Sequence, residues 1–295
     1  MIDLHCHSTA SDGTLSPTQL VQLALTIPLT ALALTDHDTV NGLPEFLEAS
    51  KQADALECIP GVEFSCQLES GDTCHIVGLY IDSKCGELQD ACEQYCIWRK
   101  ERNRQIVIKL NELGYDLAIE DLENAKKEEA GVIGRPHIAA ALVAKGYFKQ
   151  NKKAFQELLG RGRPAYVSRQ VLPAARCLNA IHAAGGLAVW AHPMASNSMT
   201  YSKCERHIVE LKASGLDGIE AYYTEHSQLQ TKNIIGIAEK TGLFVSGGAD
   251  FHGSNQPSIH MGTGYGGMSI PDSLMPPIKA AYERRGGSAK CLVNL

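Results

Sequence analysis

Four short apolar runs, each preceded by an amphipathic helical stretch, constrain the fold more than any other feature of this sequence. The run ALALT (31–35) follows SPTQLVQLAL, in which Ser16 suits a helix N-cap and Pro17 the first helical position. The other runs are LAVWA (187–191), GIEAYY (218–223) and LFVSGGAD (243–250). Apolar runs that alternate with helices are typical of parallel strands covered by helices. The pattern predicts an α/β fold of the βα-barrel kind.

One segment departs from this alternation. ECIPGVEFSCQL and TCHIVGLYI flank the tetrapeptide ESGD, which is typical of a hairpin turn. With the turn centred near Glu69 and Ser70, Glu63 and His75 are expected roughly opposite each other across the two strands. A slip of the register by one residue would separate the two side chains.

The alternation stops between about Lys84 and Arg163. This segment contains a long helical pattern (CGELQDACEQYCIWRKERNRQIVIKLNELG) followed by AIEDLENAKKEEA, PHIAAALVAKGY and NKKAFQELLG. A length of 295 residues accommodates one large α/β domain with an insertion. We interpret 84–163 as a helical insertion that covers the active site of a barrel formed by 1–83 and 164–295.

Charge and cysteine content narrow the class of protein. The net charge is −6, so a broad nucleic-acid-binding face is not expected, although a few arginines could still hold a small phosphorylated ligand. The ten cysteines form no C-x-x-C pair, which favours reduced thiols and a cytoplasmic location. MIDLHCH does not resemble a signal peptide, and no apolar stretch reaches the ~18 residues of a membrane span. Cys74, beside His75, is a candidate neighbour of a metal.

Two histidines stand at the end of the first apolar run. In MIDLHCHSTASDGT, His5 and His7 are separated by one residue, and Asp12 follows in the next loop. On a strand the two imidazoles point to one face, while Cys6 points to the other. This arrangement suits a transition metal, and the alternative is an ordinary pair of partly buried histidines.

More ionisable residues follow the other predicted strands. Together they form a set of nine: His5, His7, Asp12, His37, Glu63, His75, His192, Asp250 and His252. Most lie at carboxyl ends of buried strands, where a βα-barrel builds its active site. Because uncompensated buried ionisable groups are costly, and because imidazole with carboxylate suits Zn, Mn or Fe, we predict a metal centre at this rim.

The same residues carry a family resemblance. HCHSTASDG, TDHDT, GVEFS, CHIVG, WAHP and ADFHG resemble the successive motifs of the polymerase and histidinol phosphatase (PHP) superfamily. The resemblance implies a distorted (β/α)7 barrel with up to three divalent metal ions, with Mn expected and Fe or Zn as alternatives. By position, it implies a first metal at His5, His7, Glu63 and Asp250, a second at Asp12, His37 and His252, and a third at His75 and His192 with Glu63 bridging.

Two further motifs resemble one branch of this superfamily. GRPHIA (134–139) and RGRPAYV (161–167) are similar to motifs of nucleoside 3′,5′-bisphosphate phosphatases and of 5′-to-3′ exonucleases of short RNA. The resemblance implies that Arg99, Arg102 and Arg135 bind a substrate phosphate. A solvated basic face is the alternative for the arginines of WRKERNRQ. His137 is expected either to touch substrate or to cap local structure.

The expected activity is hydrolysis of the 3′ phosphate ester of a 5′-phosphorylated nucleotide, with a metal-bridging hydroxide as nucleophile. Asp12 and His37 would serve the catalytic metals, and His226 or a metal-bound water would protonate the leaving oxygen. The expected substrate is a small phosphorylated nucleotide or a short RNA, and no membrane partner is expected. A histidinol-phosphate phosphatase and a non-catalytic metal-binding regulatory module are the alternatives.

Overall fold

The computed structural model describes residues 1–126, 133–196 and 199–287. Residues 127–132 lie within the predicted insertion and include the last four residues of the predicted helical stretch AIEDLENAKKEEA; they are outside the described residues. The chain divides into two compact units. The first combines Met1–Cys92 with Val171–Leu295, and the second is Glu93–Gln170.

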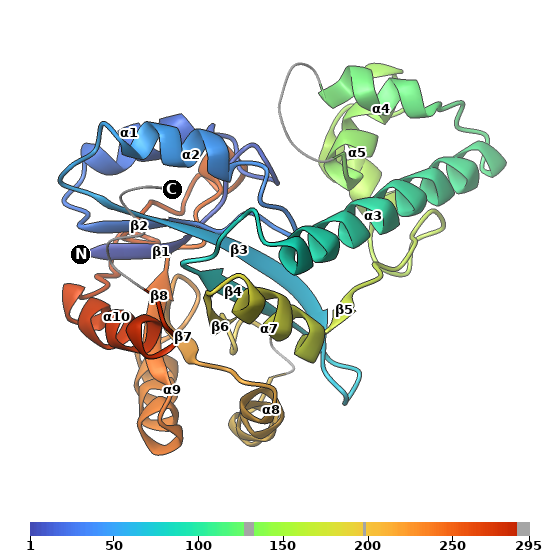
Figure 1. The fold of residues 1–295 in the computed structure, drawn as a ribbon. Coiled ribbons are helices and arrows are strands. Elements are labelled where there is room, and N and C mark those ends of the chain that lie inside the picture. The colour runs from blue at the N-terminus through green and yellow to red at the C-terminus, as the bar shows by residue number, and fades with distance from the viewer. Residues whose placement is uncertain (127–132, 197–198, 288–295) are drawn as a thin grey trace. The chain divides into compact units, whose positions relative to one another are not determined.

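A curved sheet forms the centre of the first unit (Figure 1). Its strands are β1 (Ile2–Cys6), β2 (Ala31–Leu34), β3 (Glu57–Gln67), β4 (Thr73–Leu79), β5 (Leu172–Pro173), β6 (Leu187–Ala191), β7 (Gly218–Tyr223) and β8 (Phe244–Gly248). Among the described residues they are ordered β1-β2-β3-β4-β6-β7-β8, with β5 beside β3. Neighbours on this path pair in parallel except β4, which is antiparallel to both β3 and β6.

Backbone hydrogen bonds join the two ends of this sheet. The His7 N–H donates to the Phe251 carbonyl at 2.9 Å, and the Asp250 N–H donates to the His5 carbonyl at 2.9 Å. These bonds link the end of β1 to the segment that follows β8, so the sheet is a nearly closed barrel. The predicted α/β class and the distorted barrel are confirmed.

The hairpin of β3 and β4 differs in register from the expectation. Glu63 lies opposite Val77, and His75 lies opposite Ser65, so the pairing is shifted by two residues. A shift of two residues keeps each side chain on its face of the sheet, whereas a shift of one would reverse it. Glu63 and His75 therefore meet diagonally, with His75 Nδ1 3.0 Å from Glu63 Oε1.

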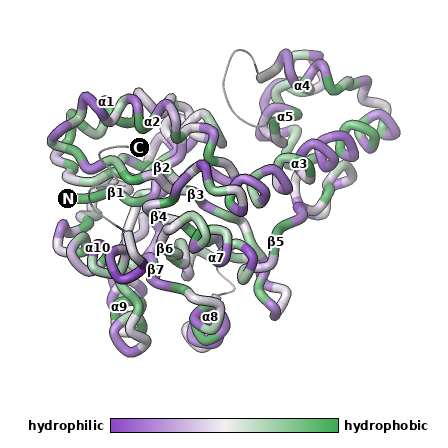
Figure 2. The backbone as a smooth tube through the Cα atoms, in the orientation of Figure 1, coloured by the Kyte–Doolittle hydropathy of each residue, from purple (hydrophilic) through white to green (hydrophobic). Residues whose placement is uncertain are grey.

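Helices follow most strands of the first unit, as the alternating pattern predicts. They are α1 (Pro17–Leu25), α2 (Leu43–Ser50), α7 (Ala174–Ala183), α8 (Tyr201–Ala213), α9 (Gln228–Thr241) and α10 (Met275–Arg284). Helix α1 begins as predicted: Ser16 accepts a hydrogen bond from the Gln19 N–H, and Pro17 is the first helical residue. Hydrophobic residues make up much of β1 and β2 (Figure 2), and both strands are buried along their whole length. The strand β2 is apolar throughout, whereas β1 also buries Asp3 and His5.

The second unit is helical. Helix α3 (Gly86–Glu112) enters it, and α4 (Ile119–Lys126), α5 (Arg135–Ala144), α6 (Asn151–Ala154) and the π-helical turn η1 (Phe155–Leu159) follow. Ile106, Leu110, Ile138, Leu142 and Leu159 are fully buried in a hydrophobic cluster of its own. No helix among the described residues combines the length and the apolar character that a membrane span requires.

Candidate metal centre

The nine predicted ligands converge within the first unit at one rim of the barrel, because the parallel strands end there and the antiparallel β4 begins there. His5 lies in β1, Glu63 in β3 and His75 in β4. The other six follow strands: His7 and Asp12 come after β1, His37 after β2, His192 after β6, and Asp250 and His252 after β8. The arrangement therefore gathers side chains that are up to 247 positions apart in the sequence, from His5 to His252.

Glu63 lies at the centre of the cluster and is fully buried. Five imidazole rings approach its two carboxylate oxygens. The nitrogen–oxygen distances are 3.3 Å for His5, 3.5 Å for His7, 2.8 Å for His37, 3.0 Å for His75 and 3.0 Å for His192. One carboxylate shared by so many histidines can bridge neighbouring cations.

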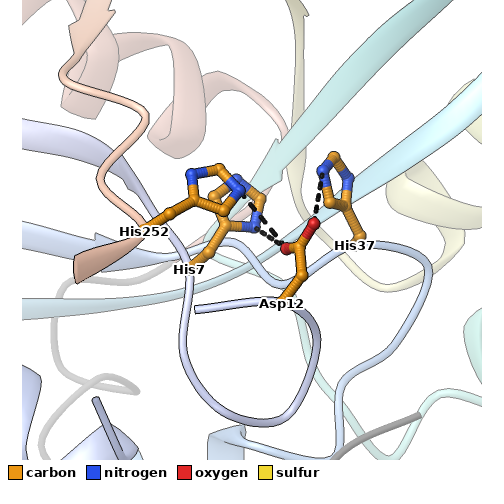
Figure 3. Close-up of side chains that lie close together, drawn as sticks. All are labelled: His7, Asp12, His37 and His252. Atoms are coloured by element: carbon orange, nitrogen blue, oxygen red, sulfur yellow. Dashed lines mark ion pairs between the residues drawn. The ribbon is translucent and has the colours of Figure 1, made fainter. Parts of the chain in front are cut away.

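Asp12 occupies a second part of the cluster, where its carboxylate lies between His37 and the pair formed by His7 and His252 (Figure 3). The shortest of these contacts joins Asp12 Oδ1 to His252 Nε2 at 3.3 Å. One candidate ligand atom from each of these four residues lies within 4.8 Å of the others. The Asp12 side chain is half exposed, so the cluster is open to solvent here.

Three other groups among the described residues meet the same distance criterion. They are His5 with Glu63 and His192, His5 with His7 and Asp250, and His37 with Glu63 and His75. These groups share members, so His5, His7, His37 and Glu63 each belong to two groups. The chain thus offers several overlapping positions for a divalent ion, and the donors are the mixture of imidazole and carboxylate that suits Zn, Mn or Fe.

The unsatisfied atoms of the cluster fit a metal. Buried side-chain atoms without a hydrogen-bond partner include His5 Nε2, both ring nitrogens of His7, His37 Nδ1, Glu63 Oε2 and Asp250 Oδ1. Several of them lie close to a polar atom of another cluster member, but not in hydrogen-bond geometry, as with His7 Nε2 and Asp250 Oδ1 at 3.1 Å. Buried polar groups are normally hydrogen-bonded, and a metal ion supplies partners for lone pairs that converge.

The electrostatics of the cluster keep its carboxylates ionised. Burial raises the pKa of Glu63, but the charges of His37, His75 and His5 outweigh burial and hold it well below its usual range. Burial, with His252 and His37 nearby, lowers the pKa of His7 to about 4. His7 is therefore neutral at pH 7, which is the form of histidine that binds metals.

Glu220, on β7, is a buried partner of the cluster that was not predicted. Its Oε1 lies 3.1 Å from His5 Nδ1, and its Oε2 accepts a hydrogen bond from the His192 N–H at 2.7 Å. A carboxylate on the far nitrogen of a metal-binding histidine fixes the tautomer and orientation of the ring. The sequence feature that could have identified Glu220 is that it is the single charged residue inside the apolar run GIEAYY.

Two candidate ligands have unusual backbone conformations. His192 has φ of 31° and Asp250 has φ of 56°, both in the left-handed region that non-glycine residues rarely adopt. Each follows a strand of the barrel directly or by one residue. Strained residues of this kind cluster at functional sites, where the surrounding structure holds them in place.

His226 and His137 bind to the backbone. His226 Nδ1 lies 3.0 Å from the Ala221 carbonyl oxygen, and its Nε2 accepts a hydrogen bond from the Met194 N–H at 3.3 Å. His137 Nδ1 accepts a hydrogen bond from the Gly134 N–H at 3.1 Å, which caps the start of α5. Cys74, considered above as a metal neighbour, has its Sγ 3.3 Å from Cys66 Sγ.

The arginines form a cluster within the second unit. Burial, followed by Arg135, Arg169 and Arg99, lowers the pKa of Arg102 to about 10. Arg102 Nε donates to the Val167 carbonyl at 3.0 Å, and Arg135 Nη1 donates to the Leu159 carbonyl at 3.2 Å. The Arg135 guanidinium also lies near the rings of Phe155 and Tyr166. Arg169 was not predicted as a member of this cluster.

Comparison with known proteins agrees with this architecture. Residues 3–171 match the PHP domain family. A 5′-3′ exoribonuclease from Haemophilus influenzae is 38% identical over 85% of this chain and 89% of its own, and a 3′,5′-nucleoside bisphosphate phosphatase from Chromobacterium violaceum is 35% identical over 88% and 90%. The solved structure of a predicted metal-dependent phosphoesterase from Bifidobacterium adolescentis superposes with a TM-score of 0.81 at 28% identity, covering 98% of this chain and 97% of that one.

The barrel, its rim of histidines and carboxylates and these similarities define a phosphoric ester hydrolase. The chain belongs to the PHP domain family. The resemblance inferred from the motifs is thereby confirmed, and the alternative of a non-catalytic binding module is not supported.

Proposed function

We propose that the protein hydrolyses the 3′ phosphate ester of 5′-phosphorylated nucleotides. The substrates would be nucleoside 3′,5′-bisphosphates and short 5′-phosphorylated RNA degraded from its 5′ end. The observation that carries the proposal is the group of nine ionisable side chains around Glu63, in a chain similar to both a bisphosphate phosphatase and an exoribonuclease. Both activities break an ester at a 3′ oxygen, so one site can perform both.

The nine side chains would hold divalent ions, with Glu63 bridging and His5, His7, Asp12, His37, His75, His192, Asp250 and His252 completing the sites. Such ions lower the pKa of a bound water and neutralise charge on phosphoryl oxygens. Ionised Glu63 and Asp250 balance the cations, and neutral His7 offers a lone pair. Asp12 stands at the solvent-exposed side, where a phosphate can approach.

We propose that Arg99, Arg102 and Arg135 bind the 5′ phosphate. Guanidinium groups bind phosphate in a bidentate manner and keep their charge at neutral pH. The support is that burial, followed by Arg135, Arg169 and Arg99, lowers the pKa of Arg102, so an anion bound there would offset the repulsion between these cations. The capping bond of His137 orients the start of α5, next to Arg135, so we assign His137 a positioning role.

We propose that a metal-bound water, and not His226, would protonate the leaving oxygen. Both ring nitrogens of His226 contact backbone groups, and burial lowers its pKa. A proton on Nε2 would require the bond from the Met194 N–H to break. In this proposal His226 fixes the segment that follows β7.

Replacing Arg135 tests the proposal. A charge-assisted contact to phosphate contributes on the order of 1.5–3 kcal/mol, or roughly ten- to a hundredfold in kcat/KM. Arg135→Ala should lose that much on adenosine 3′,5′-bisphosphate and little on adenosine 3′-monophosphate, which has no 5′ phosphate. Arg104→Ala is the matched control, because Arg104 is exposed on the same helix as Arg99 and Arg102.

Two results would contradict the proposal. An equal loss of kcat/KM on both substrates in Arg135→Ala would show that Arg135 does not bind the 5′ phosphate. Turnover of histidinol phosphate in preference to any nucleotide would support the alternative substrate class.

A further inference from the structure

A hollow of about 600 Å³ opens beside the candidate metal centre, within the first unit. It is lined by the end of β7, the first turns of α9 and the loop 263–269, and its volume is in the range of small-molecule sites. We infer that this hollow binds the nucleobase of the substrate. The inference rests on the proposed function, because it assumes that the substrate is a nucleotide.

Tyr223 connects the hollow to the metal centre. Its ring lines the hollow, and its hydroxyl donates a hydrogen bond to Asp250 Oδ2 at 3.3 Å. The same ring lies 5.2 Å from the ring of His192 and 5.0 Å from that of His226, measured between centroids. A ligand in the hollow therefore borders the residues that would hold the scissile phosphate.

The walls match the chemistry of a base. Tyr222, Tyr223 and Tyr265 supply aromatic faces, on which any nucleobase can stack. Thr231 and Lys232, from α9, supply hydroxyl and ammonium donors for the polar edge of a base or for ribose oxygens. Lys232 is the one charged side chain among the described residues that line the hollow, so its surface is mostly neutral.

The loop 263–269 holds the side chain of Tyr265 exposed at the edge of the hollow. This side chain is 59% exposed, so its ring is accessible to a ligand in the hollow. The neighbouring Gly264 and Gly266 have φ of 56° and 94°, and reciprocal backbone bonds between His260 and Gly264 close the turn. A Cβ on Gly264 would lie 2.9 Å from the Thr224 hydroxyl, so this glycine lets the loop approach the end of β7. The turn thus holds an exposed ring beside the hollow.

The test compares the binding of adenosine 5′-monophosphate with that of ribose 5-phosphate, which lacks the base, by calorimetry on the full chain. The inference predicts tighter binding of the nucleotide by the wild type. In Tyr265→Ala the ratio of the two affinities should fall about 5- to 100-fold, which corresponds to the loss of one stacked base. Tyr265→Phe should keep the ratio, because the ring remains.

Leu229→Ala is the matched control. Leu229 is 64% exposed on the same helix as Lys232 but does not line the hollow, so the affinity ratio should stay at its wild-type value. An unchanged ratio in Tyr265→Ala, or a wild type that binds both ligands equally, would overturn the inference. Phosphate release from adenosine 3′,5′-bisphosphate tests the proposed function separately, so a failure of one is distinguishable from a failure of the other.

Discussion

Glu220 shows how a residue outside the predicted ligand set can control a metal centre. It contacts His5 through one oxygen and the His192 backbone through the other, so it orients two candidate ligands at once. Partners of this kind typically change metal affinity by about 10- to 100-fold. We expect Glu220→Gln to weaken metal binding by that factor, since the carboxylate charge beside His5 Nδ1 is lost while the side-chain volume is kept.

Competition with a chelator of known affinity would measure this effect. Glu225→Gln is the control, because Glu225 is exposed a few residues further along the chain. Metal binding as tight in Glu220→Gln as in the control would show that Glu220 does not support the centre.

At the residue scale, the sequence predicted nine side chains at and near strand ends, including His5, Glu63 and His75 within strands, but it missed Glu220. His192 and Asp250 stand where an apolar run stops, so their polarity is conspicuous. Glu220 lies inside a strand, where a charged residue is easily assigned to a solvent-facing position. Its contacts depend on which strands become neighbours, and local patterns do not contain that information.

Asp217, just before β7, links several elements. It accepts hydrogen bonds from the Ala188 N–H of β6 and from Arg285 beyond α10, and it pairs with His182 of α7. Burial raises its pKa, but His182, the Ala188 N–H and Arg285 outweigh burial, so the pKa is lowered. Because the folded pKa lies below the unfolded value of about 3.9, Asp217 stabilises the fold above that pH, and the stabilisation is lost as the pH falls through the folded pKa.

We expect Asp217→Asn to lower the free energy of unfolding at pH 7 by about 1–3 kcal/mol, since bonds to charged groups are replaced by weaker ones. The difference from the wild type should shrink when the pH is lowered towards 3. Urea unfolding at both pH values measures it. A difference that stays constant with pH would contradict a role for the carboxylate charge.

The hairpin of β3 and β4 shows the limit of prediction at the scale of elements. The sequence indicated two strands and a turn, but the register shifted by two residues because the hairpin is centred on Ser70, with Gln67 opposite Thr73. Side-chain alternation distinguishes odd shifts from even ones and cannot distinguish even shifts from each other. The meeting of Glu63 and His75 was therefore predictable, whereas their exact pairing was not.

At the scale of the whole molecule, the chain consists of two units with separate cores. Leu142 is fully buried in the cluster of the Glu93–Gln170 unit. We expect Leu142→Ala to destabilise that unit by about 2–5 kcal/mol, as is usual for a cavity in a core. Hydrogen exchange should become faster in the described parts of residues 93–170 and stay slow in β1, β2 and β6.

Ile181→Ala makes the reciprocal change, because Ile181 is fully buried in the first unit. It should accelerate exchange around α7 and leave the second unit protected. Equal acceleration across both units in either variant would show that they unfold together.

The fold class, an α/β barrel, could be predicted from the sequence because apolar strands that alternate with helices have few possible arrangements. The limits of the inserted segment were harder to predict. Helix α3 continues from the first unit into the second without a break in its pattern, so no loop marks the boundary near Glu93. That the segment covers the active site remains our proposal.

The central claim is that the side chains around Glu63 would hold divalent ions, and that the protein hydrolyses the 3′ ester of a 5′-phosphorylated nucleotide at this site. The most direct measurement is product analysis after incubation of adenosine 3′,5′-bisphosphate with chelated and with metal-reloaded protein. We predict no turnover after chelation, and adenosine 5′-monophosphate with phosphate after a divalent transition metal is restored. Full activity in the metal-free protein, or adenosine 3′-monophosphate as the product, would contradict the account.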